Sequence, residues 1–460
     1  MTPALFARHA LLPQGWQRDV LFEWDAHGDL TLVAPGAVAP PGARQAQYVL
    51  PGMVNLHSHA FQRALGGLTE IAGEGPDSFW TWRDLMYRFA ARITPDQIEA
   101  IAAQLFAECL RHGYTSLCEF HYLQRDVDGR SYARPAETAE RVAAAGQITG
   151  MGLTLLPVLY SHAGFGEQPL KPAQARFRTD VDEVLGIVEA LAPLRSGQLE
   201  VGAAPHSLRA ATIDQIRALS AGLPQGRPLH IHIAEQQGEV EQCLAHARRR
   251  PVEYLMDHIA LDARWCLVHA THLNDAEVTA LARSGAVAGL CPTTEANLGD
   301  GLFPLAPFIE AGGRFGIGSD SHVSQSPVEE LRWLEYGQRL LHQQRNVAHT
   351  RAQRHVGDYL WQAALAGGAH AAGRRVGLLE AGRRADLLVL DDAHPNLDGV
   401  NEAEVLGRVV FCGNDNLVRD VLCGGRWVVQ QGRHVAQEEV ARRYRQALRD
   451  LRAVTQEVKQ

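Results

Sequence analysis

The sequence predicts an α/β protein: a closed (β/α)8 barrel of the TIM type with a small β-sandwich domain formed by both ends of the chain. Three observations support this prediction. Short apolar strands alternate with helical stretches in the middle of the chain. Polar residues recur at the ends of those strands, and strand-like segments occupy both termini. The 460 residues, 46% of them hydrophobic, can build one large core and a smaller one.

Residues 1–49 contain strand-like pieces and no helical pattern. Two apolar stretches, 19–24 and 29–33, flank a hairpin-like turn at 25–28. A link rich in Pro, Ala and Gly follows at 34–44. We expect residues 1–49 to form part of the small domain.

From residue 50 to residue 373 the pattern changes to parallel β/α units. Helical stretches such as 95–112 and 275–284 separate short apolar runs. Eight strand–helix units predict a closed barrel. The eight predicted strands are 49–56, 115–120, 152–159, 200–204, 228–233, 265–269, 286–291 and 314–317.

A second strand-rich region follows the barrel. Residues 385–391, 405–411 and 418–429 resemble the amino-terminal strands in character. We therefore expect 374–435 to join 1–49 in one small domain, and a polar helix to occupy 436–460.

Composition and charge exclude several classes of function. The net charge is −8 and no basic run occurs, so we expect no nucleic-acid partner. No signal-peptide pattern and no membrane-spanning apolar run is seen. The seven cysteines are scattered without a paired motif, which fits a reducing cytoplasm.

Polar side chains follow six of the eight predicted strands. His57 and His59 end the first strand, and residues two apart on a strand point to the same side, as a metal clamp requires. Taken alone, this pair is equally consistent with two ordinary polar residues. The other strand ends carry Glu119, His121 and Tyr122; His206 and Arg209; His230, His232 and Glu235; His269; and Asp320 and His322.

Four of these side chains are expected to bind one divalent metal ion. His57, His59, His232 and Asp320 supply three imidazoles and a carboxylate, which suit Zn²⁺ and also Fe²⁺. A further coordination position would hold water, whose pKa the metal lowers toward ~7.

Three residues are expected to carry the chemistry. Asp320 would take a proton from the water, and Glu235 would deliver one to a leaving nitrogen. His269 would hydrogen-bond the attacking hydroxide or the developing negative charge. A structural or surface role is at least as well supported as a functional one for His121, His230, His272 and His322.

In these motifs the chain resembles the amidohydrolase superfamily. The matching stretches are 51–59, 230–235, 268–269 and 316–320, with 367–373 and 382–391 where the barrel returns to the small sheet. The His-x-x-Glu motif looks like the mononuclear deaminase branch, and the third and fourth strands offer no lysine for a dinuclear bridge. The resemblance thus implies one metal ion per chain, and also a homodimer.

Within that branch, residues 57–68, 79–86, 118–123, 204–209 and 318–324 resemble the formimidoylglutamate deiminases. The resemblance implies hydrolysis of N-formimidoyl-L-glutamate to N-formyl-L-glutamate and ammonia, in histidine degradation. Arginine matches the carboxylates of such a substrate, so Arg83 and Arg209 are expected to bind them. Residues 66–90 would form a lid. The residues expected to orient the substrate are Gln62, Tyr122 and His206.

Two alternatives stay open at this point. A deaminase of a neutral heterocycle, such as a purine or a triazine, would share the metal site but favour aromatic and amide groups over two arginines. A non-catalytic scaffold barrel would have lost a ligand or Glu235, all of which are present. Ammonia release from a substrate panel tests the first alternative, and metal analysis with an activity assay tests the second.

Overall fold

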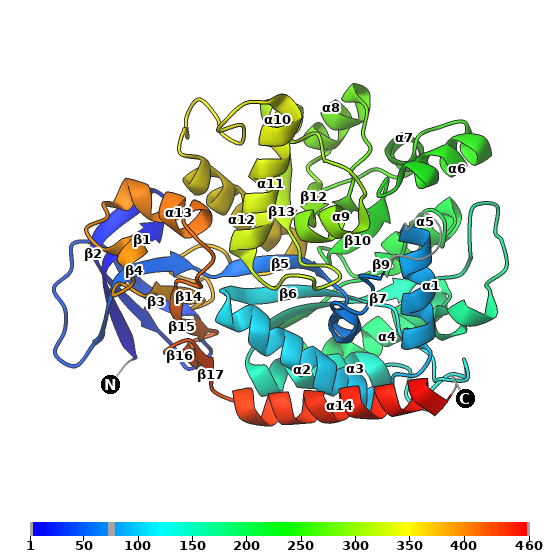
Figure 1. Cartoon of the computed structure of the whole chain (residues 1–460), viewed down its shortest axis with the longest axis horizontal. Coiled ribbons are helices and arrows are strands. Elements are labelled where there is room, and N and C mark those ends of the chain that lie inside the picture. The colour runs from blue at the N-terminus through cyan, green and yellow to red at the C-terminus, as the bar shows by residue number, and fades with distance from the viewer. Residues whose placement is uncertain (1–2, 72–78, 458–460) are drawn as a thin grey trace.

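A computed structural model of the chain describes residues 3–71 and 79–457. Figure 1 shows a strand-rich sheet at the left, built from both ends of the chain, beside a barrel of parallel strands wrapped by helices. The predicted fold class is thereby confirmed. In these described ranges, no helix is long and apolar enough to cross a membrane.

The barrel strands form two hydrogen-bonded parallel sheets that meet at two seams. They are β5 (Met53–Ser58), β6 (Tyr114–His121), β7 (Gly152–Leu159), β8 (Leu199–Val201), β9 (Ala204–Pro205), β10 (Leu229–Ile233), β11 (Trp265–His269), β12 (Val287–Leu290) and β13 (Arg314–Ile317). β5 to β9 form one sheet, and β10 to β13 form the other. Bridges from Ser58 to Asp320 and from Ser207 to His232 close the seams.

The barrel helices begin at residues that favour helix starts. Thr94, before α2, accepts a hydrogen bond from the Gln97 N–H at 3.3 Å, and the Gln97 side chain accepts one from the Thr94 N–H at 3.0 Å. The same capping box opens α4, α5 and α8. The helices are α1 (Phe79–Ala90), α2 (Pro95–Arg111), α3 (Glu137–Thr149), α4 (Val181–Leu191), α5 (Ile213–Gly222), α6 (Gln237–Ala247), α7 (Pro251–His258), α8 (Asp275–Ser284), α9 (Pro292–Leu298), α10 (Leu305–Glu310), α11 (Pro327–His342) and α12 (Val356–Ala372).

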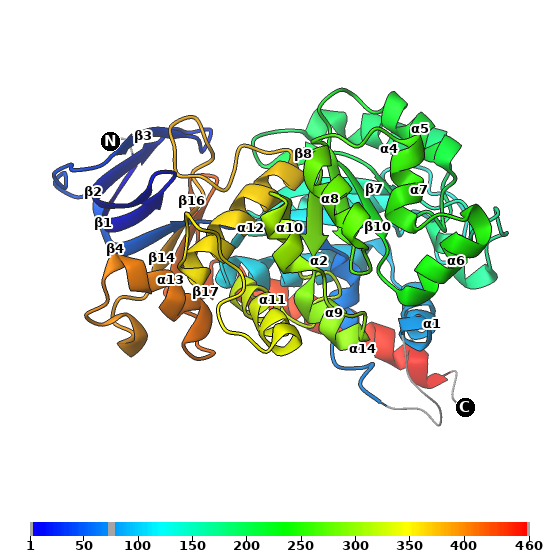
Figure 2. The same cartoon turned by 90° about the horizontal axis from the view of Figure 1, so that it is seen from above.

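The small domain is one continuous eight-stranded sheet. In order across the sheet its strands are β17 (Arg433–His434), β16 (Arg426–Gln430), β15 (Val418–Cys423), β14 (Leu387–Leu390), β4 (Arg44–Pro51), β1 (Ala4–Leu12), β2 (Gly15–Trp24) and β3 (Leu30–Ala34). Trp24 Nε1 donates a hydrogen bond to the Gly425 carbonyl at 3.0 Å, although their strands are far apart in this order. The predicted sandwich is therefore a single sheet that curls over its own apolar core (Figure 2).

The first predicted barrel strand, 49–56, is wrong as one element. It is divided between β4, in the small sheet, and β5, in the barrel. Gly52 lies between them, and its N–H donates to the Asp386 carbonyl at 3.0 Å. A Cβ at this position would lie 2.2 Å from Thr115 Oγ1, so only glycine lets the chain pass from one sheet to the other here.

The strand predicted at 405–411 is also wrong, because these residues belong to helix α13 (Glu402–Phe411). The Asn401 side chain accepts a hydrogen bond from the Ala403 N–H at 3.1 Å and so starts the helix. Buried residues recur at helical spacing, which a short apolar run does not reveal. They are Val405, Leu406, Val409 and Val410.

The last helix, α14 (Gln437–Glu457), lies along the barrel beside α2 and α3, in red in Figure 1. Arg443 forms an ion pair with Glu99 of α2 at 2.6 Å. Tyr444 OH donates to the Arg63 carbonyl at 3.4 Å, in the short 3-10 helix η1 (Ala60–Leu65) that follows β5. The polar carboxyl-terminal helix expected from the sequence is thus attached to the barrel wall.

Candidate active site

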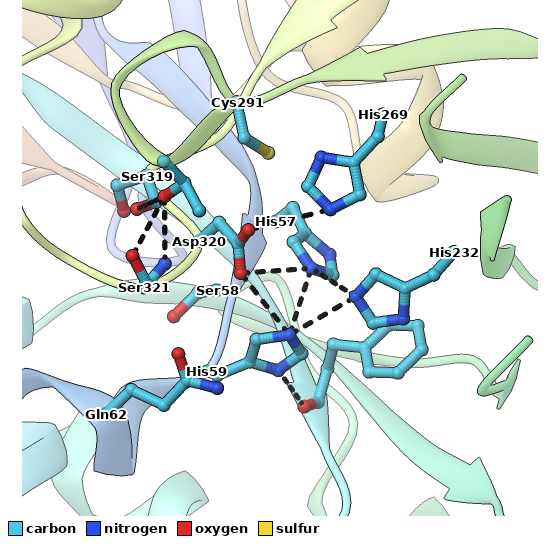
Figure 3. A network of polar contacts seen from close by, with 12 residues as sticks. His57, Ser58, His59, Gln62, His232, His269, Cys291, Ser319, Asp320 and Ser321 are labelled. Atoms are coloured by element: carbon cyan, nitrogen blue, oxygen red, sulfur yellow. Dashed lines mark hydrogen bonds and ion pairs between the residues drawn. The ribbon is translucent and has the colours of Figure 1, made fainter. Parts of the chain in front are cut away.

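Three imidazoles meet at the carboxyl end of the barrel strands. His57 and His59 point to the same side of β5, as their spacing predicts, and His232 comes from β10. Their Nε2 atoms lie 3.0 to 3.3 Å from one another. Figure 3 shows the three rings turned toward one point. Three buried ring nitrogens so close together fit one metal ion.

Backbone carbonyls hold two of these rings. His59 Nδ1 lies 2.9 Å from the Phe120 carbonyl oxygen, and His232 Nδ1 lies 3.0 Å from the His206 carbonyl oxygen. A carbonyl oxygen only accepts hydrogen bonds, so each Nδ1 carries the hydrogen and donates it. The lone pair of each Nε2 is therefore directed at the shared point.

Asp320 joins the three imidazoles across the barrel seam. Its Oδ1 lies 3.6 Å from His57 Nε2 and 3.4 Å from His59 Nε2. Its N–H donates to the His57 carbonyl at 3.0 Å, and its carbonyl accepts from the His59 N–H at 3.2 Å. Closure of the barrel at this seam is thus what brings the carboxylate to the imidazoles.

Several strand ends around the site have a left-handed backbone. The φ angle is +44° at Asp320, +67° at His269 and +51° at Ala234. Such angles are uncommon for residues other than glycine and cost about 1–3 kcal/mol each. Because they occur where site residues leave their strands, they help set the direction in which these side chains enter the site.

Burial has opposite effects on the imidazoles and on Asp320. It lowers the pKa of His59 to about 3, and it lowers the pKa of His57 and of His232 well below the ordinary value, with neighbouring rings adding to the effect. Burial also raises the pKa of Asp320 to about 7, against the lowering effect of His269. The imidazoles are thus neutral, which is the form that binds metals.

His269 lies between the two residues expected to move protons. Its Nε2 is 3.6 Å from Glu235 Oε1 and 3.6 Å from Asp320 Oδ2. Burial alone would lower the pKa of His269, but Glu235, a hydrogen bond to Glu295, and Asp320 together raise it to about 10. A cationic His269 can hydrogen-bond a developing negative charge between these carboxylates.

One cavity is lined by His59, His232 and Asp320 and by all five residues expected to bind substrate. Its free volume is about 50 Å³, well below the ~300 Å³ or more of typical ligand pockets. Helix α1 forms one wall of this cavity. The predicted lid, 66–90, includes α1, whereas residues 72–78 lie outside the described residues. The five residues are Gln62, Arg83, Tyr122, His206 and Arg209.

The two arginines of this cavity share one aromatic neighbour. The Arg83 and Arg209 guanidinium carbons lie 4.6 and 5.9 Å from the centre of the Trp80 ring. Arg209 is buried, and its ion pair with the buried Glu239 spans 4.0 Å. Within the described part of the chain, Arg83 forms no ion pair. Both guanidinium groups thus retain capacity for an anionic ligand.

The three residues expected to orient the substrate are also buried or nearly so. Gln62 Nε2 donates to Tyr122 OH at 2.8 Å, while Gln62 Oε1 has no partner among the described residues. The His206 ring stands edge-on to Tyr160, with ring centres 4.6 Å apart. These side chains offer polar atoms to the cavity from η1, from the position after β6 and from the loop after β9.

The four histidines left open by the sequence lie outside the metal-facing group. His121 bonds Thr138 Oγ1 at 2.9 Å, and His230 donates to the Ala371 carbonyl at 2.9 Å. His322 bonds the hydroxyls of two serines at 3.0 and 3.1 Å. His272 is only partly buried and lies before α8. These contacts support a structural role for the three buried rings.

Sequence reasoning missed several polar residues of the site. Glu295 and Asp300 follow β12, and each lies beside His269. Glu119, in β6, accepts hydrogen bonds from Ser58 Oγ at 2.6 Å and from the Ala60 N–H at 2.7 Å. The available signal was the polar stretch after the seventh strand, 292–300.

Comparison with known proteins finds relatives that match nearly the whole chain. Residues 48–428 match the family described as "Amidohydrolase family", and residues 2–47 match "Formimidoylglutamate deiminase HutF, N-terminal domain". A formimidoylglutamate deiminase of Pseudomonas aeruginosa is 55% identical over 97% of this chain and 99% of its own length. A 5-methylthioadenosine/S-adenosylhomocysteine deaminase of Natronomonas pharaonis is 28% identical over 94% of this chain and 90% of its own.

A solved structure is also similar along its full length. The crystal structure of an amidohydrolase from Brucella melitensis superposes with a TM-score of 0.92 and 44% sequence identity. The match covers 98% of this chain and 99% of that one. The barrel and the small sheet therefore occur together in both proteins.

Proposed function

Because this chain belongs to the amidohydrolase family, we propose that it hydrolyses N-formimidoyl-L-glutamate to N-formyl-L-glutamate and ammonia in histidine degradation. The observation that supports this proposal is the 55% identity to a formimidoylglutamate deiminase over 97% of this chain. The match of residues 2–47 to the deiminase amino-terminal domain agrees with it. The protein is accordingly a hydrolase that acts on C–N bonds.

Members of this superfamily bind a divalent metal, and this site has a donor set that fits one. We propose that His57, His59, His232 and Asp320 hold one ion per chain. Three nitrogens and a carboxylate suit Zn²⁺, with Fe²⁺ as the alternative. When bound, the ion supplies a Lewis acid that activates water toward the formimidoyl carbon.

The proton steps are assigned to groups that face this point. Asp320 takes the proton of the water at a carboxylate oxygen, since its Oδ2 faces His269 and its Oδ1 faces the imidazoles of the metal-facing group. Glu235 delivers a proton through Oε1 to the leaving nitrogen. His269, 3.6 Å from both carboxylates, orients the attacking oxygen by a hydrogen bond from Nε2.

Substrate selection is assigned to the two arginines. A glutamate derivative carries two carboxylates, and Arg83 and Arg209 offer charge-assisted hydrogen bonds to them from the same cavity. Gln62, Tyr122 and His206 orient the substrate through their polar atoms. The two arginines argue against a neutral heterocycle, which would offer no anionic partner to Arg83 and none beyond Glu239 to Arg209.

The remaining features of the enzyme concern its surroundings, its assembly and its domains. We propose a cytoplasmic homodimer with no nucleic-acid or membrane partner; free cysteines and the net charge of −8 agree with this. We also propose a division into a small domain, 1–49 with 374–435, a catalytic barrel, 50–373, and a carboxyl-terminal helix, 436–460.

The test is ammonia release from N-formimidoyl-L-glutamate by the purified, metal-loaded protein, with the product identified as N-formyl-L-glutamate. Formimidoyl compounds that lack one carboxylate should react much more slowly, and a purine panel should release no ammonia. Efficient release from a purine with none from the glutamate derivative would refute the proposal.

A further inference from the structure

A buried carboxylate that the mechanism above does not use lies directly behind His269. Glu295, in α9, has Oε1 3.2 Å from His269 Nδ1. The other ring nitrogen of His269, Nε2, faces Glu235 and Asp320. The ring is thus held at one nitrogen by Glu295 and presents its other nitrogen to the reacting groups.

The position of Glu295 is itself fixed by the start of α9. Its Oε1 accepts the Cys291 N–H at 2.9 Å, and its own N–H donates to the Cys291 carbonyl at 2.9 Å. Its residue is only 5% exposed. The carboxylate is therefore held by its own helix turn and has little freedom to move away from the imidazole.

The same short helix also contacts the loop that carries Asp320. Thr294 Oγ1 accepts the Ser321 N–H at 3.2 Å and lies 3.0 Å from Ser321 Oγ. The segment after β12 thus contacts both His269, through Glu295, and Ser321, the residue next to Asp320. Asp320 in turn faces His269. This arrangement can keep Nε2 of His269 at a set distance from Asp320.

We propose that Glu295 is a positioning residue for His269. Glu295 Oε1 already accepts the Cys291 N–H and faces Nδ1 as an acceptor, so it keeps the hydrogen on Nδ1 and fixes the plane of the ring. His59 and His232 are held in the same way, by carbonyls at Nδ1. This inference rests on the proposed function, in which His269 acts on the substrate side through Nε2.

A matched control is needed to distinguish the positioning of His269 from a purely structural role of Glu295, and Glu330 provides one. Glu330 is fully buried and accepts hydrogen bonds from Thr293, in the same helix, at 2.9 Å from N and 2.6 Å from Oγ1. It is not in the cavity of the site. Glu330→Gln should therefore disturb α9 without loosening His269.

The kinetic test uses Glu295→Leu, which removes the acceptor, and Glu295→Gln, which keeps a carbonyl oxygen. Glu295→Leu should lower kcat by about 10–100-fold, as lost outer partners of a site do, with KM within about threefold. Glu295→Gln should lose less, and Glu330→Gln should keep kcat. An equal loss in Glu295→Leu and Glu330→Gln would overturn the proposal.

A double-mutant cycle shows whether Glu295 acts through His269. If it does, His269→Asn with Glu295→Leu should be no slower than His269→Asn alone, within about twofold. Fully multiplicative losses would overturn the proposal. Should Glu295→Leu fail to fold, as shown by thermal unfolding, the same cycle is run with Glu295→Gln.

A readout without activity separates this inference from the proposed function. ¹⁵N NMR of histidine-labelled protein, with the His269 signals identified by their loss in His269→Asn, reports which ring nitrogen carries hydrogen. Nδ1 should be protonated in the wild type and should change in Glu295→Leu. An unprotonated Nδ1 in the wild type would overturn the positioning role. A wild type that releases no ammonia would instead overturn the proposed function.

Discussion

The site contains two kinds of buried histidine, which differ in what lies at their nitrogens. His59 and His232 donate Nδ1–H to backbone carbonyls, and their pKa values fall because burial dominates. His269 has carboxylates at both nitrogens, and its pKa rises to about 10. All three rings come from ends of barrel strands.

The difference shows that neighbours, and not residue type or place in the fold, decide whether a buried imidazole of this site is neutral or charged. A neutral carbonyl orients a ring without adding charge, so the lone pair of Nε2 stays available. Surrounding carboxylates stabilise the imidazolium, in which a proton occupies that lone pair. The following experiments test this contrast.

The largest effect is expected at the metal-facing group. His57→Ala, His232→Ala or Asp320→Ala should remove the metal and lower kcat/KM by about 10³-fold or more, because metal catalysis supplies several kcal/mol. Metal content by mass spectrometry and ammonia release measure the two effects. A fully active protein without metal would contradict the proposal that the neutral imidazoles bind a metal that catalysis needs.

The next effect concerns the carboxylate beside His269. Glu235→Gln keeps the size of the side chain but cannot deliver a proton, so kcat should fall by about 10²–10⁴-fold. Metal content should stay at the wild-type level, unlike in the variants above. Near wild-type kcat in Glu235→Gln would show that another group is the acid.

Variants of the two substrate-binding arginines test a contribution to catalysis that is separate from both kinds of histidine. Arg209→Met and Arg83→Met should each lower kcat/KM by about 10²–10³-fold, because a carboxylate of the substrate loses its buried partner. A substrate analogue without one carboxylate should lose little further rate against one of the two variants. Losses that multiply in every combination would show that neither arginine contacts the substrate.

The two kinds of histidine should affect stability in opposite pH ranges. The pKa of His59 in the fold is about 3, below the ~6.5 of the unfolded chain. Below pH ~6.5 the unfolded state therefore binds more protons, and stability is lost as pH falls, by up to ~1.4 kcal/mol per pH unit for one group. Metal-free His59→Asn should lose less stability than wild type between pH 7 and about 5 in denaturant titrations.

For His269 the sign is reversed. Its folded pKa of about 10 lies above the unfolded value, so its contribution is complete below pH ~6.5 and is lost as pH rises through about 10. Metal-free His269→Asn should flatten the stability profile between pH 7 and about 9.5. Wild-type profiles in both variants would remove the electrostatic basis of the comparison.

The smallest catalytic effect is expected for a third kind of histidine, which bonds only to the protein. His230 donates to the Ala371 carbonyl and is not among the three imidazoles that meet at the site. His230→Asn should keep metal content and kcat within about twofold, while unfolding free energy falls by ~1–3 kcal/mol as a buried acceptor loses its donor. A loss of metal would place His230 in the site.

The sequence was sufficient for the features that depend on residues near one another in the chain. Alternating strands and helices predict the barrel, since each pattern is set over a few residues. The His-x-His pair and Asp320 could be assigned because strand ends of a closed barrel share one face. His57, His59, His232 and Asp320 lie together as expected, although their role as ligands stays a proposal.

Only the tertiary structure decided the features that depend on contacts between distant segments. Glu295 reaches His269 because β11 and β12 are neighbours, and no local pattern marks that hydrogen bond. The break at Gly52 is set by the closeness of Thr115 in the next strand. Burial and charge, which separate the pKa of His269 from that of His59, are sums over neighbours from many strands. They take their values only when the barrel closes.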